Sequence, residues 1–408
     1  MTEIPDKRHQ PSPLVYLAPC GIALGHAGRC IPIAKKLVAE GFDVVFSTYG
    51  DAVGFVEREG FRTLQVPTIR MGEREDGSFD FNLTTLQGPQ QIQNLKDQVR
   101  AEYTQMKVLR PSLVVSDSRL SPIIAAKTLG IPCLLLLHQL KVLIPHRTRL
   151  GIGRRLLKIV AERVMLEGLG AVWSRSDLIF VPDFPPPLTI AKSNMHKRFL
   201  RNRKIRFVGP VIPILPSELP SKSEIRRKLK IDPSRRLIYA SIGGTVDEKL
   251  EITRLLERTL EKLSDEYAFI ISRGLPDVNM PERREDNFLV VNWIPNRFEV
   301  LKAADLIIGR GGHNTVAEAI YYGVPQIHIP SPFHSEHESN ARSAVELGVA
   351  KVLQQDLLSG EAVREAVTEA LSQDFRRRVE RIQAKASSFN AVQSVVEAAE
   401  TFVQSQLK

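Results

Sequence analysis

The sequence predicts an α/β protein of two domains, each built on a parallel sheet that is wound on both faces by helices. The 408 residues are enough for two domains of about 150 residues or more. Short, continuously apolar runs alternate with amphipathic stretches, as expected for buried parallel strands joined by crossover helices. A proline-rich interruption between Phe207 and Pro220 divides this alternation into two halves.

The first half contains five predicted strands and four predicted connecting helices. The strand candidates are short and apolar, whereas the helix candidates carry an apolar stripe at helical spacing. The strands are predicted at Leu14–Cys20, Asp43–Thr48, Leu113–Asp117, Cys133–His138 and Leu178–Pro182, and the helices at Ile31–Glu40, Asp51–Glu59, Gln90–Leu109 and Ser121–Leu129.

The alternation resumes after the interruption. Its strands are predicted at Leu237–Ser241, Ala268–Ser272, Phe288–Trp293, Leu306–Gly309 and Gln326–Pro330. The last stretch, Asp374–Leu407, has no glycine or proline and is predicted to be helical. We therefore expect a first domain at 1–207, a linker at 208–222, a second domain at 223–373, and a C-terminal helix at 374–408 that packs back across the domains.

Composition excludes several classes of protein. Hydrophobic residues at 43% and charged residues at 25% are ordinary globular values. The cysteines Cys20, Cys30 and Cys133 form no Cys-x-x-Cys pair, which argues against a disulfide framework or a thiolate zinc site. The longest apolar run, Cys133–Leu137, is too short to cross a bilayer, and no signal segment is visible before Pro13. We expect a cytoplasmic protein.

The positive charge is concentrated in one segment. The net charge is +10, and residues 140–206 contain fifteen Lys or Arg against four Asp or Glu. Within this segment, Ile152–Glu167 predicts a basic amphipathic helix that could lie in a lipid interface, the alternative being an ordinary domain helix with a solvated charged side. The clustered cations around Lys192–Arg206 favour an anionic membrane surface. Nucleic acid is disfavoured because the segment has few aromatic residues and no recognition motif.

Candidate ligand-binding residues follow the predicted strands, because ligands of open parallel sheets lie beyond the carboxyl ends of the strands. The loop Cys20–Arg29 follows the first strand and contains Gly25 and His26, and a later strand ends at Asp117. The glycines lack dinucleotide spacing and no P-loop lysine is present, which excludes the simplest nicotinamide and ATPase interpretations.

Two glycine turns in the second half precede predicted helices. The turn of Gly243, Gly244 and Thr245 either lets backbone amides approach a diphosphate or is a tight turn with a Thr cap. The turn at Gly309–Glu318 combines such amides with Arg310 and places Glu318 in reach of ribose hydroxyls. A metal site is disfavoured, because prolines interrupt the group of histidine and glutamate candidates and no Asp-x-Asp occurs. That group comprises His328, His334, Glu336 and His337.

Two motifs in the second half carry a family resemblance. Gly312, Asn314, Thr315 and Glu318 match the Gly-x-Asn-Ser/Thr-x-x-Glu core of a donor signature, and Trp293–Asn296 resembles Trp-x-Pro-Gln. The sequence therefore resembles the metal-independent GT-B glycosyltransferases, particularly the UDP-glycosyltransferases and the MurG-type N-acetylglucosaminyltransferases. The resemblance implies two Rossmann-like domains that face each other across a cleft, a UDP-sugar as co-substrate, and no metal or other cofactor.

The resemblance also implies roles for the donor-side residues. Trp293 would flank the uracil, the backbone of Ile294 would read its edge, and Glu318 would hold the ribose. The diphosphate would be bound by Arg310, Asn314 and Thr315, together with the amides of the glycine turns and the helix that opens at His313. Glu336 and His337 take the place of the pair that contacts sugar hydroxyls, and Asn296 replaces a glutamine. UDP-N-acetylglucosamine is our first choice, and UDP-glucose, UDP-galactose and deoxythymidine diphosphate sugars stay open.

On the acceptor side, His26 falls where inverting members place the acceptor-activating base, and Asp117 falls where many place its carboxylate partner. A neutral imidazole can take the hydroxyl proton while the carboxylate stabilises the imidazolium. The alternatives are a phosphate contact or a helix cap for His26 and a strand-end cap for Asp117. Gly25 would lie on the acceptor side, and His138 would either contact the acceptor or be a buried, hydrogen-bonded histidine.

The sequence therefore predicts an inverting glycosyltransferase that acts on a lipid-linked or membrane-associated acceptor, peripheral on the inner face of the cell membrane. One alternative is a sugar-nucleotide epimerase or hydrolase of the same fold. Another is a non-catalytic protein that binds a nucleotide sugar and recruits a second transferase to the membrane.

Overall fold

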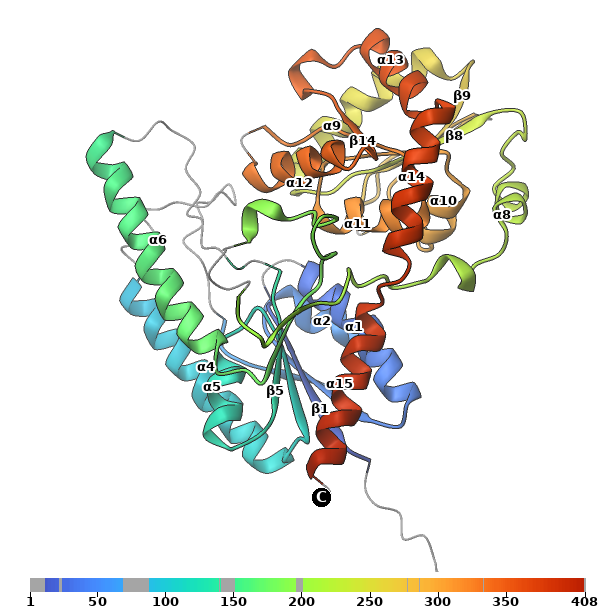
Figure 1. Cartoon of the computed structure of the whole chain (residues 1–408). Coiled ribbons are helices and arrows are strands. Elements are labelled where there is room, and N and C mark those ends of the chain that lie inside the picture. The colour runs from blue at the N-terminus through green and yellow to red at the C-terminus, as the bar shows by residue number, and fades with distance from the viewer. Residues whose placement is uncertain are drawn as a thin grey trace, which may run out of the picture.

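The chain folds around two seven-stranded sheets covered by helices (Figure 1). This computed structural model describes residues 12–21, 24–68, 88–138, 140, 151–195, 201–276, 278–285, 287–332 and 334–406. We call the parts built on the two sheets the first and the second domain. The predicted fold class, two Rossmann-like α/β domains, is confirmed.

The first sheet has the strand order β3-β2-β1-β4-β5-β6-β7, and all of its neighbours are parallel. Its strands are β1 (Leu14–Pro19), β2 (Asp43–Thr48), β3 (Thr63–Gln65), β4 (Leu113–Asp117), β5 (Cys133–Leu136), β6 (Leu178–Val181) and β7 (Ile205–Phe207). Its helices are α1 (Leu24–Ala39), α2 (Asp51–Arg58), α4 (Gly88–Leu109), α5 (Ser121–Thr128) and α6 (Ile152–Trp173).

The second sheet has the order β10-β11-β9-β8-β12-β13-β14, parallel except for β10, which runs antiparallel to β11. Its strands are β8 (Arg236–Ser241), β9 (Tyr267–Ser272), β10 (Arg283–Glu285), β11 (Phe288–Val291), β12 (Leu306–Gly309), β13 (Gln326–His328) and β14 (Ala350–Val352). The helices are α8 (Lys222–Lys228), α9 (Val246–Leu260), α10 (Arg297–Ala303), α11 (His313–Tyr322), α12 (Ser335–Glu346) and α13 (Gly360–Ala370). Short 3-10 helices lie at Lys192–Asn194, Pro216–Glu218, Glu261–Leu263 and Gln355–Leu357.

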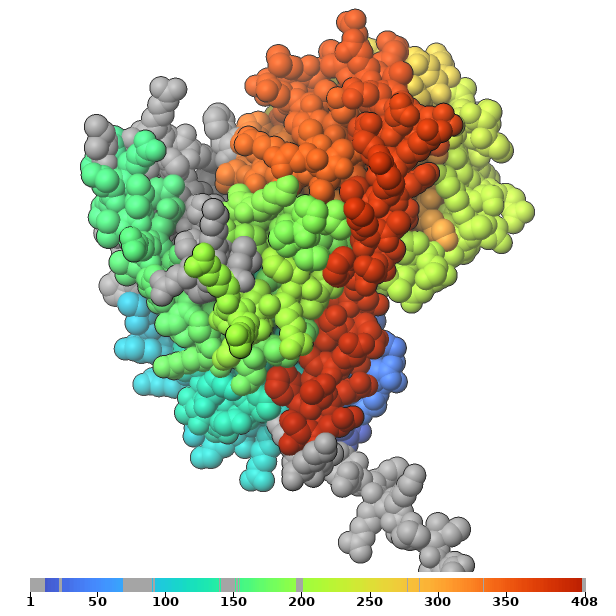
Figure 2. All heavy atoms as spheres, in the orientation of Figure 1, coloured from blue at the N-terminus to red at the C-terminus, as the bar shows by residue number. Residues whose placement is uncertain are grey.

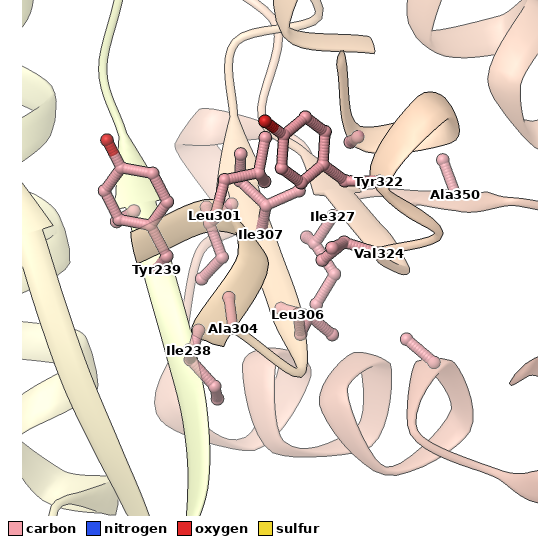
Figure 3. Close-up of a cluster of buried hydrophobic side chains, with 14 of the residues drawn as sticks. Ile238, Tyr239, Leu301, Ala304, Leu306, Ile307, Tyr322, Val324, Ile327 and Ala350 are labelled. Atoms are coloured by element: carbon pink, nitrogen blue, oxygen red, sulfur yellow. The ribbon is translucent and has the colours of Figure 1, made fainter. Parts of the chain in front are cut away.

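Apolar side chains cover both faces of the first sheet. Val15 and Leu17 of β1 point into a cluster with α1 and α2, whereas Tyr16 and Ala18 of the same strand point to the opposite face. This alternation follows from the two-residue period of a strand. In the second domain, buried side chains of β8, β12, β13, α10 and α11 converge in one cluster, part of which is drawn in Figure 3.

The C-terminal stretch forms two helices instead of the single helix that its composition predicts. They are α14 (Gln373–Ala386) and α15 (Ala391–Gln406). Phe375 of α14 joins the apolar cluster of the second domain, while Val395 of α15 joins that of the first, beside α1. Figure 2 shows the two helices as a continuous band over both domains. Between them, Phe389 packs on Gly209, which has a positive φ of 80° and no room for a Cβ.

Helix α1 begins at Leu24, seven residues before the predicted start at Ile31. The prediction treated Cys20–Arg29 with its three glycines as a flexible loop before the helix. In the structure Pro32 lies inside the helix, and Gly25, His26 and Gly28 belong to it as well. His26 is therefore held by a helix in place of the flexible loop that we expected.

Helix α6 turns large apolar side chains outward, the arrangement that the interfacial interpretation requires and an ordinary domain helix does not. Its charged pair Lys158 and Glu162 is only 17% and 18% exposed, while a set of large apolar side chains faces outward. We call this set the α6 patch; the exposed fractions run from 42% to 66% for Leu156, Leu157, Ile159, Val160, Val164 and Met165. No described helix is both long enough and apolar enough to span a bilayer.

Candidate active site

The predicted acid–base pair is formed. His26, on the first turns of α1, places Nδ1 2.8 Å from Oδ1 of Asp117, the last residue of β4. The Asp117 side chain is fully buried, whereas 21% of the His26 side chain is exposed. Strand β1 pairs with β4, which brings the amino end of the helix that follows β1 next to the end of β4. The imidazole thus has an orienting carboxylate on one side and solvent access on the other.

Arg29 is a third member of this group, and the sequence analysis missed it. Its guanidinium makes two hydrogen bonds to the Asp117 carboxylate, and Nη2 lies 2.9 Å from Nδ1 of His26. Arg29 follows His26 by three positions, so the i, i+3 spacing of a helix was the available signal. Burial by itself raises the pKa of Asp117, but Arg29 and His26 hold it well below its usual range. Asp117 is therefore an ionised, paired carboxylate.

His138, just beyond the end of β5, belongs to the same group. Its Nδ1 lies 3.1 Å from Nη1 of Arg29, and its ring centroid is 5.8 Å from that of His26. Burial, Arg29 and His26 lower the pKa of His138 well below its usual value. His138 is thus a neutral imidazole. Its contact with Arg29 fits the interpretation of a hydrogen-bonded histidine, one of the two that the sequence left open.

The second domain contributes the amino end of α11, where a diphosphate was predicted. The N-cap is Gly312, so no side chain satisfies the first backbone N–H groups of this helix. Gly311 has a positive φ of 82°, and a Cβ there would lie 2.6 Å from the His337 carbonyl oxygen. Asn314 is exposed and Thr315 is half-buried. The turn therefore presents free amides and two polar side chains to an anion.

His313, the first residue of α11, joins the two domains. Its Nε2 lies 3.4 Å from Oδ2 of Asp183, which follows β6, and its ring centroid is 6.1 Å from that of His138. Burial lowers the pKa of His313, but the Asp183 carboxylate raises it above its usual value. The carboxyl ends of both sheets therefore meet at the three histidines His26, His138 and His313.

Glu318 is held by a partner that the sequence analysis did not include. Arg297, at the start of α10, binds both Glu318 carboxylate oxygens, at 2.5 and 2.6 Å. Glu318 is 4% exposed. A ribose at this position would therefore meet a carboxylate that is already oriented and neutralised by a bidentate arginine.

Arg310 is also engaged within the protein. It is 3% exposed, and its guanidinium donates to Ser331 Oγ at 2.6 Å and to Gln355 Oε1 at 2.7 Å. A diphosphate contact by this side chain stays a prediction. In this structure Arg310 ties the loop after β12 to the loops after β13 and β14.

The turn at Gly243–Thr245 follows β8 and makes the cap that was the alternative in the sequence analysis. Thr245 Oγ1 accepts from the Glu248 N–H, and Glu248 Oε2 accepts from the Thr245 N–H at 3.0 Å. This is a capping box at the start of α9. Gly244 has a φ of 127°, which explains the glycine there.

The residues assigned to base and sugar lie after β11 and at the start of α12. Trp293 is 47% exposed, and Ile294 is half-buried against the second-domain cluster. Glu336 and His337 are half-buried. The His337 ring stacks on that of His334 at a centroid distance of 3.7 Å, and burial with His334 and Arg310 lowers the pKa of His337 to about 3. Gly25 is exposed on α1.

Metal-ligating residues do not cluster in the part of the chain that is described. There, no three His, Cys, Asp or Glu side chains are placed to share a metal ion. His328 is fully buried and its Nε2 bonds to Gln326 Oε1 at 2.7 Å. The cysteines Cys20, Cys30 and Cys133 are free thiols.

Comparison with known proteins identifies relatives of this chain. Residues 242–400 match the glycosyltransferase family 28 C-terminal domain. An uncharacterized glycosyltransferase of Methanosarcina mazei is 27% identical over 388 residues, which cover 93% of this chain and 95% of the relative. The UDP-N-acetylglucosamine–N-acetylmuramyl-(pentapeptide) pyrophosphoryl-undecaprenol N-acetylglucosamine transferase of Desulforamulus reducens is 28% identical over 204 residues, 46% of this chain and 54% of that enzyme.

Solved structures share the fold over nearly the whole chain. The calicheamicin glycosyltransferase aligns with a TM-score of 0.68 at 19% identity, covering 98% of this chain and all of that one. MurG of Acinetobacter baumannii aligns with a TM-score of 0.60 at 18% identity, covering 96% and 100%. Enzymes of glycosyltransferase family 28 are typically metal-independent. The full-length relative, the shared fold and the family match together show that this chain is a glycosyltransferase of GT-B fold, with a family 28 match over residues 242–400.

Proposed function

We propose that this glycosyltransferase inverts the anomeric centre and transfers a sugar from a UDP-sugar, first choice UDP-N-acetylglucosamine, to a hydroxyl of a lipid-linked or membrane-associated acceptor. One observation carries the proposal: the His26–Asp117 pair and the uncapped end of α11 meet at one place, through the rings of His138 and His313. A base and an anion-binding helix end are what a metal-independent displacement needs.

The proposed reaction is a single displacement. His26 takes the proton of the acceptor hydroxyl, whose oxygen forms a bond to the anomeric carbon. The bond from that carbon to the β-phosphate oxygen breaks, and UDP leaves with the electron pair. Charge on the leaving group is met by the amino end of α11, which carries about half a positive charge. Asp117 and Arg29 hold the imidazole in place throughout.

Two relatives support a pyrimidine nucleotide donor. The name of the Desulforamulus reducens enzyme contains UDP-N-acetylglucosamine as donor, and one similar solved structure, the glycosyltransferase VinC, is a complex with dTDP. The paired Glu318 and the exposed Trp293 offer a ribose and a base their contacts. UDP and dTDP are therefore the two nucleotides to compare.

Calorimetric titration without metal is expected to show binding of UDP and of one UDP-sugar. Replacement of Glu318 by alanine should weaken UDP binding about ten- to a hundredfold, since a hydrogen bond to a charged group contributes about 1.5–3 kcal/mol. The matched control is Glu346→Ala. Glu346 is an exposed residue at the end of α12 that pairs with Lys192, and this variant should bind UDP normally. Absence of binding for every nucleotide tested, with or without metal, would contradict the donor assignment.

We further propose that the α6 patch docks on a lipid surface next to the active site. The carboxyl-terminal part of α6 packs on the first-domain core through Leu166, Leu169 and Trp173, which leaves the patch on the amino-terminal part. That part lies toward the carboxyl ends of the strands, because α6 leads into the amino end of β6. Exposed Arg155 and Arg163 flank the patch. Contiguous exposed apolar residues with basic neighbours are typical of an interfacial helix.

Of the remaining basic residues of 140–206, Arg201, Arg203 and Arg206 are exposed, whereas Lys192 and Lys204 are engaged within the protein. Lys192 pairs with Glu346 at 2.6 Å, and Lys204 donates to the carbonyl oxygens of Ser174 and Ser176 at the far end of α6. Lys197 and Arg198 lie outside the described residues. The apolar side chains of α6, more than the total charge of the segment, therefore support the proposed membrane contact.

Flotation with anionic vesicles at low salt is expected to carry the protein to the lipid fraction. The double variant Leu157→Ser/Val160→Ser should lose most of this binding, because both side chains are more than half exposed in the patch. Val108→Ser is the control, since Val108 on α4 is an apolar residue that is even more exposed than Leu157 and Val160. Equal flotation of the double variant and the wild type would exclude the patch as the docking surface.

A further inference from the structure

His138 has a defined tautomer because of Arg29. A guanidinium has five N–H donors and no acceptor, so a hydrogen bond from Arg29 Nη1 to His138 Nδ1, 3.1 Å away, needs a lone pair on that nitrogen. A neutral imidazole carries its single proton on the other nitrogen. The geometry therefore places the proton of His138 on Nε2 and makes Nε2 a hydrogen-bond donor. The contact of Arg29 Nη2 with His26 Nδ1 differs, because both of these nitrogens have the ionised Asp117 carboxylate as their acceptor.

The neighbours of His138 oppose a second proton. The charged and titratable groups that face its ring are Arg29 and His26 on α1, His313 on α11 and Asp117 at the end of β4. The first three disfavour a positive charge on His138, and only Asp117 favours one. Asp117 accepts hydrogen bonds from Nε and Nη2 of Arg29, and this pairing largely neutralises its charge. His138 stays a neutral donor through neutral pH.

The free donor lies at the place where the two domains meet. Among the described residues, none accepts a hydrogen bond from His138 Nε2. The ring centroid is 6.1 Å from that of His313, the first residue of α11, whose backbone N–H groups have no side-chain cap. A donor from the first domain and the uncapped amino end of a second-domain helix therefore lie close together.

We propose that His138 Nε2–H donates to a diphosphate oxygen of the nucleotide sugar, and that Arg29 is the positioning residue that holds His138 in this form. The inference rests on the proposed donor site and adds a first-domain residue to it. A bound donor would then contact both domains through one phosphate. Arg29 would link the His138–phosphate contact to the proposed base, since Arg29 also contacts His26 and Asp117. His138 makes this hydrogen bond as a neutral group, because the positive charge of Arg29 would repel a protonated His138.

The binding test compares two substitutions of His138 by titration with UDP in the absence of metal. His138→Leu removes the donor and should weaken UDP binding about tenfold, the effect of about 1.4 kcal/mol. His138→Gln restores an N–H donor and should regain most of that affinity. Equal affinity of wild type and His138→Leu would overturn the proposal, as would a loss in both variants alike. If the wild type itself does not bind UDP, the proposed function fails, and the second test below still decides the tautomer.

The second test reads the tautomer from ¹⁵N–¹H correlations of histidine-labelled protein, with the His138 signals assigned by their absence in His138→Gln. The expected pattern is a protonated Nε2 and an unprotonated Nδ1 that do not titrate between about pH 5.5 and 8.5. In Arg29→Met, and more mildly in Arg29→Lys, the Nδ1–H form should appear. A wild-type His138 that carries its proton on Nδ1, or that titrates in this range, would overturn the role of Arg29 without any variant.

Discussion

Replacement of His26 by alanine is expected to lower kcat/KM by about 10²- to 10⁴-fold, the range that a general base contributes. The imidazole is the partly exposed member of the His26–Asp117 pair and the group proposed to take the proton of the acceptor hydroxyl. UDP affinity should stay within about twofold of the wild type, since the donor contacts lie on the second domain and His138. Product formation from the donor and a lipid extract, together with calorimetry of UDP, measures the two effects.

Asp117→Asn should reduce turnover by a similar factor. The amide keeps the shape of the carboxylate, but it removes the charge that Arg29 and His26 share. Because the pKa of Asp117 lies well below its usual range, this group stays ionised at every working pH, so the pH dependence of the rate should not report Asp117. Lys35→Ala is the control on the exposed side of α1. Near-normal turnover in both His26→Ala and Asp117→Asn would remove the catalytic assignment.

The sequence predicted the central strands of both sheets and missed the edges. The five strands predicted in each half all exist, and no end is shifted by more than two residues. The four missed strands, β3, β7, β10 and β14, have three residues each and stand at the ends of the two sheets. An edge strand pairs on one side only, so it needs no continuous apolar run such as Cys133–Leu136 of β5.

The candidate site was predictable where motif and topology coincide. His26 and Asp117 follow strands that are neighbours in the sheet, so the carboxyl-end rule alone brings them together. The partners of Glu318 and Arg310 were not predictable, because Arg297 and Gln355 lie 21 and 45 positions away and meet them only through the packing of separate elements. Which side of α6 faces outward stayed open at the sequence level, because a helical wheel gives the faces of a helix but not which one meets the protein.

Replacement of Glu102 by alanine is expected to destabilise the first domain by about 3–5 kcal/mol, since removal of one partner of a buried ion pair leaves an uncompensated charge. Glu102 on α4 is fully buried and pairs with Arg119, which is 4% exposed. It also accepts from Tyr16 Oη at 2.5 Å and from Ser47 Oγ at 2.8 Å. Denaturant unfolding of the variant measures the loss.

The double variant Glu102→Leu/Arg119→Met separates the pair from its burial penalty. Replacing both charges with apolar side chains should recover most of the lost stability, because buried ion pairs are often no more stabilising than apolar residues of similar size. Glu40→Ala, which breaks an exposed pair with Lys36, should leave the unfolding curve unchanged. A double variant as unstable as Glu102→Ala would mean that the hydrogen bonds of Tyr16 and Ser47 carry the stability instead. Arg119, two residues beyond Asp117, also donates to the Ser47 carbonyl oxygen. Turnover of the refolded double variant therefore reports whether this network holds the Asp117 carboxylate in place.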